Sequence, residues 1–367
     1  MTRPTAMRAR PTGRPRVAIR PLGCLLPRRR VMLAPTLNAP STTSTAAATA
    51  PGRASRALRV AESERTAQRS HRAYRLASHM SRSARHFWPT WRYVKAMITQ
   101  ADKARRFLAL HRAGEPLLMP NPWDLGSAKL LAGLGFEALA TTSSGFAATL
   151  GRNDGSVSRE EALVHSAIIV AATDLPVSAD LENAYAHEPA GVAETIGLAV
   201  EVGLAGCSVE DFTGRDDDPI YDRRLAAERI AAAAEVAHAG PVPFVLTGRA
   251  ENYLHGRPDL ADTIARLQAY QEAGADVLYA PGLRSIENIR RVIREVDRPV
   301  NVLAMAGAPA VPELAEAGVS RISVGGSFAF AALGALVSAA TELLEQGTYG
   351  YQAASAVGRQ AAIRAFG

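Results

Sequence analysis

The sequence is poor in cysteine, with only Cys24 and Cys207 among its 367 residues. This scarcity excludes a disulfide framework and a zinc site built from several cysteines, and it suits a reducing compartment. Apolar runs are also short, and none approaches the roughly 18 residues that span a bilayer. The longest, Phe328–Thr341, is rich in small residues and predicts a packed helix. We therefore expect a cytoplasmic protein without a membrane partner.

Acidic residues are almost missing from the first part of the chain. Residues 1–96 hold 20 Lys and Arg against Glu62 and Glu64, a formal charge of +18. The remainder holds 22 of the 42 basic and 33 of the 35 acidic residues, a formal charge of −11. The basic pI therefore comes from the first segment, and the acidic body lacks the positive footprint of a nucleic-acid-binding core.

Residues 1–96 are rich in Arg, Ser, Ala, Thr and Pro and show no sustained periodicity, so we expect a disordered basic leader. Three explanations are open for it. The start could be assigned too far upstream, because Met97 opens a well-patterned segment. The segment could be a transit peptide for mitochondria or another organelle. It could also be a basic arm that contacts nucleic acid or membrane.

After Met97, short apolar runs alternate with stretches of helical period, which predicts one catalytic domain over residues 97–367. The expected strands are Pro116–Met119, Ala138–Thr142, Pro176–Asp180, Cys207–Glu210, Pro243–Thr247, Asp276–Ala280, Pro299–Leu303 and Arg321–Val324. The expected helices are Ala128–Leu134, Arg159–Ala172, Val192–Val202, Leu225–Ala239, Ala261–Ala273, Ile286–Glu295 and Val311–Ala317. Eight such repeats indicate an α/β protein with a TIM-type (β/α)8 barrel.

The first strand is not followed by the glycine-rich phosphate turn of an open doubly wound sheet, since that turn reads PNPWDLGSA without G-x-G-x-x-G. A helical tail from Ser327 to Phe366 exceeds what a barrel needs. It could cap the barrel or pack on another subunit.

Polar residues gather at the ends of the expected strands, where a barrel places its catalytic groups. Asp180, Glu182 and Glu210 follow the third and fourth strands, and Asp154 follows the second. Four carboxylates crowded in a barrel mouth would repel one another and take up protons unless a cation neutralised them. Oxygen ligands select Mg²⁺ or Mn²⁺ over zinc. Because Mg²⁺ keeps several waters, we expect one direct protein ligand and further carboxylates that act through water.

Each of these residues also has a structural explanation. Asp180 could cap the segment that follows it, and Glu182 and Glu210 could pair with barrel arginines. Asp154 could be a turn residue. Arg249 ends the fifth strand and is expected to clamp an anionic group, because its planar fork fits carboxylate or phosphonate. Ser144 and Gly145 offer a hydroxyl and backbone amides to such a substrate.

The body resembles the isocitrate lyase/phosphoenolpyruvate mutase superfamily from about Gln100 to Ser327. The phrases that carry the resemblance are PNPWDLGSAKLLAGLGFEAL, SSGF…LGRND, SADLENAYA, CSVED, LTGRAE and VNVLAMAGAPAVPELAEAGVSRISVGG. The superfamily's third-strand signature runs Asp-x-Asp/Glu-x-Gly-Tyr-Gly. Asp180, Glu182 and Tyr185 match it, whereas Ala184 and Ala186 replace the glycines.

The resemblance implies site roles for several residues. Asp180 would be the direct Mg²⁺ ligand, while Glu182, Glu210 and Asp154 would hold waters on the metal. The substrate carboxylate would be bound by the residues that match that segment of the family: Trp123, Asp124, Ser144, Gly145, Phe146 and Arg249. The resemblance also implies C-terminal helices exchanged between subunits of a homodimer or homotetramer.

The shared chemistry of the superfamily is a metal-stabilised enolate of a 2-oxo acid. The resemblance places a gating loop after the fourth strand, where isocitrate and methylisocitrate lyases carry a Lys-x-Cys-Gly-His motif. Here Phe212–Tyr221 contains no Cys, His or Lys, and Arg215 is its candidate residue to close over an anion. We therefore expect a Mg²⁺-dependent lyase that cleaves a C–C bond of a small 2-oxo or 2-hydroxy carboxylic acid.

Three alternatives stay open. The first is P–C chemistry, as phosphoenolpyruvate phosphonomutase or phosphonopyruvate hydrolase, which should need further cationic groups in the loop. The second is a metal-binding barrel without turnover. The third is an aldolase of another barrel family, although no strand end carries the lysine that such enzymes commonly use.

A chain that begins at Met97 should fold and keep the activity of the full chain, because no part of the expected site lies before it. The measurement compares solubility, thermal unfolding and turnover of the two forms. Loss of solubility in the shorter chain would contradict the prediction that the leader is dispensable.

Overall fold

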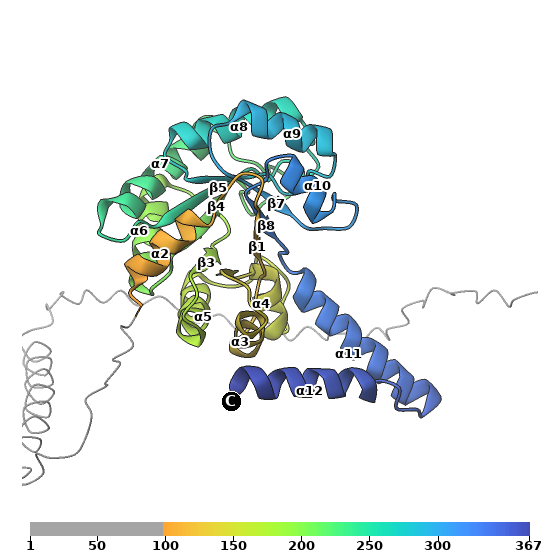
Figure 1. Cartoon of the computed structure of the whole chain (residues 1–367). Coiled ribbons are helices and arrows are strands. Elements are labelled where there is room, and N and C mark those ends of the chain that lie inside the picture. Colours follow the sequence, from red (N-terminus) through yellow and green to blue (C-terminus); the bar gives the residue numbers. More distant parts are fainter. Residues whose placement is uncertain (1–97) are drawn as a thin grey trace, which may run out of the picture. The chain divides into compact units, whose positions relative to one another are not determined.

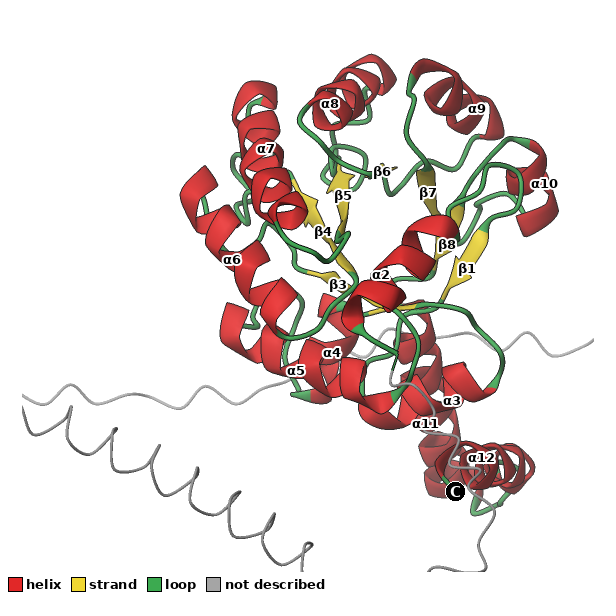
Figure 2. Ribbon diagram, turned by 60° about the vertical axis from the view of Figure 1, so that its left-hand side comes forward, coloured by secondary structure: helices red, strands yellow, loops and turns green. Residues whose placement is uncertain are grey.

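The computed structural model describes residues 98–367, so the predicted leader over residues 1–96 lies outside the described part of the chain. Eight strands form one parallel sheet in the order β1-β8-β7-β6-β5-β4-β3-β2. They span β1 Leu117–Met119, β2 Leu139–Ala140, β3 Val177–Asp180, β4 Gly206–Glu210, β5 Val245–Arg249, β6 Val277–Tyr279, β7 Val300–Leu303 and β8 Arg321–Ser323. The predicted TIM-type barrel is confirmed (Figures 1 and 2).

The ring is nearly closed between its two end strands. The Ala140 N–H donates to the Pro120 carbonyl at 3.1 Å, and the Asn121 side chain donates to the Thr141 carbonyl at 2.8 Å. These two bonds join the segment that follows β1 to β2 and to the residue directly after β2. The carboxyl ends of all eight strands therefore surround one mouth.

The helices surround the strands, as Figure 2 shows. They are α2 Gln100–Ala109, α3 Leu125–Gly133, α4 Ser143–Thr149, α5 Arg159–Ala172, α6 Pro189–Glu201, α7 Arg223–Ala239, α8 Leu260–Glu272, α9 Ile286–Glu295 and α10 Val311–Glu316. Every expected strand and helix is present, most with ends shifted by one to three residues. Helices α2 and α4 were not among the expected helices, and α4 begins at Ser143, directly after the expected end of the second strand.

Local sequence explains where several helices begin. Thr99 caps α2 and Ser158 caps α5, each in a reciprocal pair with an acidic residue three positions later, Asp102 and Glu161. Such pairs satisfy amide groups at a helix start that have no partner inside the helix. Pro189 begins α6, where its missing N–H costs nothing. These residues therefore fix the starts of α2, α5 and α6.

The predicted helical tail forms two helices, α11 Ser327–Gln346 and α12 Gln352–Phe366. Figure 1 shows α11 leading away from the barrel and α12 returning beneath it. The end of α12 lies against α3, because an added methyl group at Gly133 would meet the Ala365 side chain at 3.5 Å.

Helix α11 corrects one expectation from the sequence. An 18-residue window of this 20-residue helix has a mean hydropathy of 1.6 and is only 6% buried, so the helix is long and apolar enough to cross a membrane. The expectation that no apolar segment approaches that length was wrong, because the same helix continues beyond Thr341 with further leucines. A single helix of this kind is weak evidence for a membrane span.

Gly206 allows the amino-terminal end of the barrel to close over Phe107 of α2, which is fully buried. An added methyl group there would lie 2.5 Å from the Val245 carbonyl oxygen and 3.1 Å from the Phe107 ring. Overpacking of a filled core costs about 1–3 kcal/mol. Gly206→Ala should lower the free energy of unfolding by about that amount, measured by urea unfolding.

The matched control is Gly240→Ala, since nothing lies within 4 Å of a methyl group added at that position. It should leave the unfolding midpoint unchanged. Equal midpoints for the two variants would contradict this account of the barrel floor.

Candidate active site

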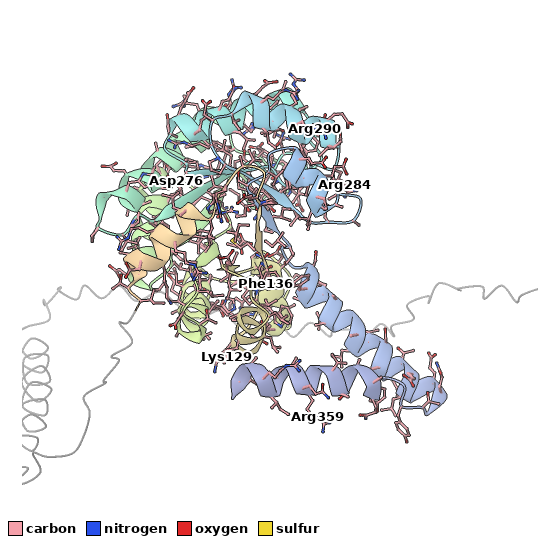
Figure 3. The ribbon with its side chains drawn as sticks, in the orientation of Figure 1. Lys129, Phe136, Asp276, Arg284, Arg290 and Arg359 are labelled. Atoms are coloured by element: carbon pink, nitrogen blue, oxygen red, sulfur yellow. The ribbon has the colours of Figure 1, made fainter. Side chains whose placement is uncertain are left out.

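A cavity of about 210 Å³ opens among the carboxyl ends of the strands. Strands β3 to β8 and the loops after β1 and β2 all contribute polar residues to its lining. These residues are Asn121, Thr141, Thr142, Ser143, Ser144, Asp154, Ser178, Asp180, Ser208, Arg249, Tyr279, Asn301, Arg321 and Ser323. Figure 3 shows charged side chains such as Arg290 and Arg359 projecting outward from the outer helices. The cavity is smaller than the roughly 300–1,000 Å³ of a drug-sized site, so it suits a molecule of a few carbon atoms.

Asp180 ends β3 and lines this cavity. The Ser143 amide donates to its carboxylate at 3.3 Å and the Ser143 hydroxyl at 3.2 Å. Its own backbone amide donates to the Thr141 hydroxyl at 2.9 Å. The carboxylate is thus held by the first residue of α4, and it also accepts the Glu182 amide at 3.4 Å, so Asp180 caps the turn that follows β3 as well as lining the cavity.

Arg249 ends β5 and is surrounded by acidic side chains. Its guanidinium lies 3.3 Å from Asp180 and 3.1 Å from Glu210, and it also bonds Glu251. Arg249 also lines the cavity, so its role as an anion clamp stays a prediction, in which its charge would be shared with three carboxylates. For Glu210, the structural alternative of an ion pair with a barrel arginine is realised.

The carboxyl groups near Arg249 shift one another's protonation. Burial, together with the nearby Asp180 and Asp154 carboxylates, raises the pKa of Glu182 to about 7. Burial also raises the pKa of Glu210 well above its usual value, although Arg249 opposes the shift. Desolvation raises the pKa of Asp154, while the Ser143 hydroxyl lowers it. The four acids are therefore coupled electrostatically, and an added cation would favour their charged forms.

The loop after β3 is strained. Glu182, Ala184 and Tyr185 all have positive φ values, of 50°, 60° and 55°. This region of backbone space favours glycine, and Ala184 stands at one of the positions where the superfamily signature has glycine. The strain places Glu182 beside the Tyr185 hydroxyl, which donates to it at 3.5 Å.

Buried Arg229 of α7 holds this strained loop in place. Its guanidinium donates to the carbonyls of Asn183, at 2.6 Å, of His187, at 2.7 Å, and of Ala186. The Thr195 hydroxyl donates to the Ala184 carbonyl at 2.8 Å. Neighbouring helices thus fix a backbone conformation that the loop would not adopt alone.

The donor set of the site suits a hard divalent cation. Within residues 98–367, no three His, Cys, Asp or Glu side chains already form a compact ligand group. Magnesium, however, commonly takes one or two carboxylates directly and keeps several waters. The crowded acids of raised pKa, with oxygen as the only donor atom, fit such a mostly hydrated ion.

Three predicted substrate-binding residues have other duties. Asp124 is the N-cap of α3, and its carboxylate accepts the Ser127 amide at 2.6 Å. Trp123 lies outside the cavity lining, and its carbonyl contacts His165. Phe146 stacks on His165 with ring centroids 3.9 Å apart and borders a small recess beside Asp180. Of the predicted set, Ser144 and Arg249 line the cavity.

Gly145 serves packing inside the protein. An added methyl group would lie 2.5 Å from the Thr142 side chain and 3.2 Å from the side chains of Ala329 and Trp123. The expectation that this glycine lets a substrate approach is therefore replaced by a close contact between α4 and α11. Its amide donates to the Thr142 hydroxyl at 3.3 Å, within the cap of α4.

Arg215 does not reach the cavity. It lies on the surface of the loop after β4, where its guanidinium pairs with Asp217 at 3.0 Å. The loop itself is closed by a bridge between Phe212 and Ile220, and Phe212 stacks on His255 with ring centroids 3.8 Å apart. His255 also lies 3.4 Å from Glu251.

One side of the cavity was not predicted from the sequence. Tyr279, Asn301, Arg321 and Ser323 line it from β6, β7 and β8. Tyr279 ends the otherwise apolar β6, so the strand-end rule that selected Asp180 could also have selected it. Burial raises the pKa of Tyr279 to about 12, which leaves its phenol protonated at neutral pH.

Comparisons with known proteins agree with this architecture. Residues 107–344 match the family model described as phosphoenolpyruvate phosphomutase. A protein of Mycobacterium tuberculosis whose activity is uncharacterised is 32% identical over 219 residues, which cover 60% of this chain and 81% of that one. A probable 2-methylisocitrate lyase of Corynebacterium glutamicum is 25% identical over 215 residues, covering 55% of this chain and 67% of that one.

Solved structures give the same result. A crystal structure assigned to the lyase/mutase class, from Burkholderia cenocepacia J2315, is 55% identical with a TM-score of 0.68 and covers 70% of this chain and 92% of its own. A phosphonomutase-like structure from the same organism is 39% identical with a TM-score of 0.62. It covers 68% of this chain and 100% of that one. The chain belongs to the phosphoenolpyruvate phosphomutase family, within the isocitrate lyase/phosphoenolpyruvate mutase superfamily.

Proposed function

We propose that this protein is a Mg²⁺-dependent lyase that cleaves a C–C bond of a small 2-oxo or 2-hydroxy carboxylic acid. One observation carries the proposal: Asp154 and Asp180 line a small cavity at the barrel mouth, and Asp180 is electrostatically coupled to Glu182 and Glu210, whose pKa values are raised and which lie behind the cavity lining. Acids in this state favour a divalent cation, and the cavity volume favours a compact substrate. The family membership supports an enzyme of the lyase and mutase type.

Asp180 would hold the cation directly, while Glu182, Glu210 and Asp154 would orient water around it. When bound, Mg²⁺ or Mn²⁺ supplies positive charge where an enolate oxygen develops as the bond breaks. Arg249 keeps Asp180 and Glu210 in position through its ion pairs. The positive charge of Arg249 thereby reduces the repulsion between these carboxylates.

The remaining lining residues bind and orient the substrate. The hydroxyl of Ser144 and the amide of Asn121 line the same cavity as Asp180. Tyr279, protonated at neutral pH, adds a hydroxyl donor on the opposite side. Arg249 lies over the Tyr279 ring, 5.2 Å from its centroid, which holds the phenol at the cavity wall.

The alternative is P–C chemistry, as a phosphonomutase or phosphonopyruvate hydrolase. The likeness to a phosphonomutase structure favours it. The loop after β4 disfavours P–C chemistry, because Arg215 is the loop's one cationic residue and pairs with Asp217 at the surface. A barrel that binds metal without turnover is the further alternative, and the substrate panel below separates all three.

We further propose a homodimer or homotetramer built through α11. Several large apolar side chains of this helix are exposed in one chain: Phe328, Phe330, Leu333, Leu336, Val337 and Leu344. A contiguous apolar surface of this kind commonly marks a protein interface. Because α11 also contacts Gly145 near the cavity, subunit association would stabilise the site.

Asp180→Ala should lower kcat/KM by about 10³-fold or more, because the enolate loses its principal stabilising charge. The measurement uses Mg²⁺ and a panel of oxaloacetate, methylisocitrate, dimethylmalate, phosphonopyruvate and phosphoenolpyruvate. We expect turnover of oxaloacetate, methylisocitrate or dimethylmalate. Turnover of phosphonopyruvate or phosphoenolpyruvate alone would establish the alternative P–C reaction.

Asp297→Ala is the matched control, because this exposed aspartate lies at the opposite end of the barrel, before β7. It should leave kcat/KM unchanged. Absence of turnover for the whole panel, or full activity in Asp180→Ala, would contradict the proposed function.

The metal should stabilise the protein more at high pH than at low pH. The pKa of Glu182 rises from about 4.5 to about 7 on folding, so the folded state binds its proton more tightly than the unfolded state. This contribution stabilises the metal-free protein fully below about pH 4.5 and is lost as the pH rises through about 7. Added Mg²⁺ competes with that proton and should raise Tm more at pH 8 than at pH 5.

Thermal unfolding in EDTA and in Mg²⁺ across this pH range measures the effect. Glu182→Gln should flatten the pH dependence of Tm in EDTA, whereas Glu316→Gln on the surface of α10 should not. An equal Mg²⁺-induced rise in Tm at both pH values would argue against proton competition at these acids.

A further inference from the structure

Arg321 is a buried cation in the cavity wall, and no carboxylate among residues 98–367 forms an ion pair with it. It lies at the start of β8, is only 2% exposed, and lines the same cavity as Asp180. Its three hydrogen-bond partners are the Asn301 amide oxygen at 3.0 Å, the Thr247 hydroxyl at 3.1 Å and the His111 ring at 3.2 Å. All three are neutral groups.

The His111 ring cannot share the charge of Arg321, because it is held in its neutral form. Burial, with Arg321 beside it, lowers the pKa of His111 to about 3. The ring nitrogen Nδ1 faces the Phe107 carbonyl at 2.8 Å and donates to it, which leaves Nε2 as the acceptor for Arg321. The His111 ring therefore orients the Arg321 guanidinium without neutralising its charge.

Other buried arginines of the described chain differ from Arg321. Arg249 has three carboxylate partners, and Arg266 pairs with Asp211 and Asp262. Arg229 bonds three backbone carbonyls away from the cavity. A buried charge without a counterion is costly, so Arg321 favours any anion that enters the cavity.

The guanidinium keeps donor capacity for such an anion. Of its five N–H groups, three bond Asn301, His111 and Thr247, which leaves two without a partner among residues 98–367. Asn301 is similarly fixed, since its amide nitrogen donates to the Ser323 hydroxyl at 3.0 Å. These residues form a preorganised wall of hydrogen-bond donors.

This wall stands across the barrel from the acidic cluster. In the strand order, β7 with Asn301 is four strands from β3 with Asp180, and β8 with Arg321 is its neighbour. The cavity between them has a volume of about 210 Å³. A short molecule can therefore meet the proposed cation at one end and Arg321 at the other.

We propose that Arg321 binds a second anionic group of the substrate, so that the site selects compounds with an anionic group at each end of a short carbon chain. This rests on the proposed lyase function and makes Arg321 a specificity-determining residue. The second group could be a carboxylate or a phosphonate, since the guanidinium fork fits both.

Calorimetry in the presence of Mg²⁺ tests the proposal with three probes. Pyruvate carries one anionic group, 3,3-difluorooxaloacetate carries two carboxylates, and 3-phosphonopyruvate carries a carboxylate and a phosphonate. Wild-type protein should bind at least one two-anion probe more tightly than pyruvate. Arg321→Met should weaken that probe by about tenfold or more and leave pyruvate unchanged, since a bond to a charged group is lost.

Which two-anion probe loses affinity identifies the second group as carboxylate or phosphonate. Asn301→Asp provides a second variant in case Arg321→Met does not fold, because it keeps the shape and the acceptor for Arg321 but neutralises its charge. It should also reduce the preference for two anions. Arg291→Met, on the exposed surface of α9, is the matched control and should change no affinity.

Equal affinities for pyruvate and both two-anion probes in the wild type would overturn the proposal, as would an unchanged preference in Arg321→Met and Asn301→Asp. A purely structural role of Arg321 would weaken all three probes alike. Failure of the lyase proposal is a separate result, because it is detected as turnover that survives Asp180→Ala, whereas the preference between probes is a binding measurement.

Discussion

The site depends on the repulsion among acidic side chains that the barrel brings to one mouth. Asp180 and Glu210 end neighbouring strands, and the strained loop after β3 adds Glu182. Arg249 relieves part of the repulsion, yet the pKa values of Glu182 and Glu210 remain raised. The chain thus holds a cluster of oxygen donors in a state that a divalent cation would stabilise, at the place where a barrel carries out its chemistry.

Much of the structure surrounding the cluster serves to maintain it. Arg229 and Thr195 hold the strained loop, and Ser143 fixes the Asp180 carboxylate. Close packing at Gly145 joins α4 to α11. Backbone strain and buried charge are both costly, and they persist where neighbouring elements constrain them. Their concentration at one end of the barrel separates the site from the regular packing at the other end.

The sequence was sufficient to predict the barrel because apolar strands and amphipathic helices alternate with a regular spacing. It also selected Asp180 and Arg249, since a polar residue at a strand end must face the mouth. It could not show that Arg249 bonds three acids, because these partners come from three different strands and loops. Asp124 was assigned to the substrate by resemblance, whereas its position before α3 makes it a helix cap.

The cationic side of the cavity was missed for a related reason. Arg321 begins a short strand, and position alone does not distinguish a side chain inside the barrel from one outside it. Its neighbours His111 and Thr247 are distant in sequence and meet only in the closed barrel. Phosphonate substrates were disfavoured because the loop after β4 contains a single cationic residue. Arg321 adds a second cation, which comes from β8 and not from that loop.

The most direct test of the central claim is titration calorimetry of Mg²⁺ and Mn²⁺ into the metal-free protein at pH 8. The account predicts uptake of one ion per chain, with affinity lost in Asp180→Ala and reduced about 10–100-fold in Glu210→Gln, whose carboxylate acts through water. No uptake by the wild type, or equal uptake by Asp180→Ala, would contradict it.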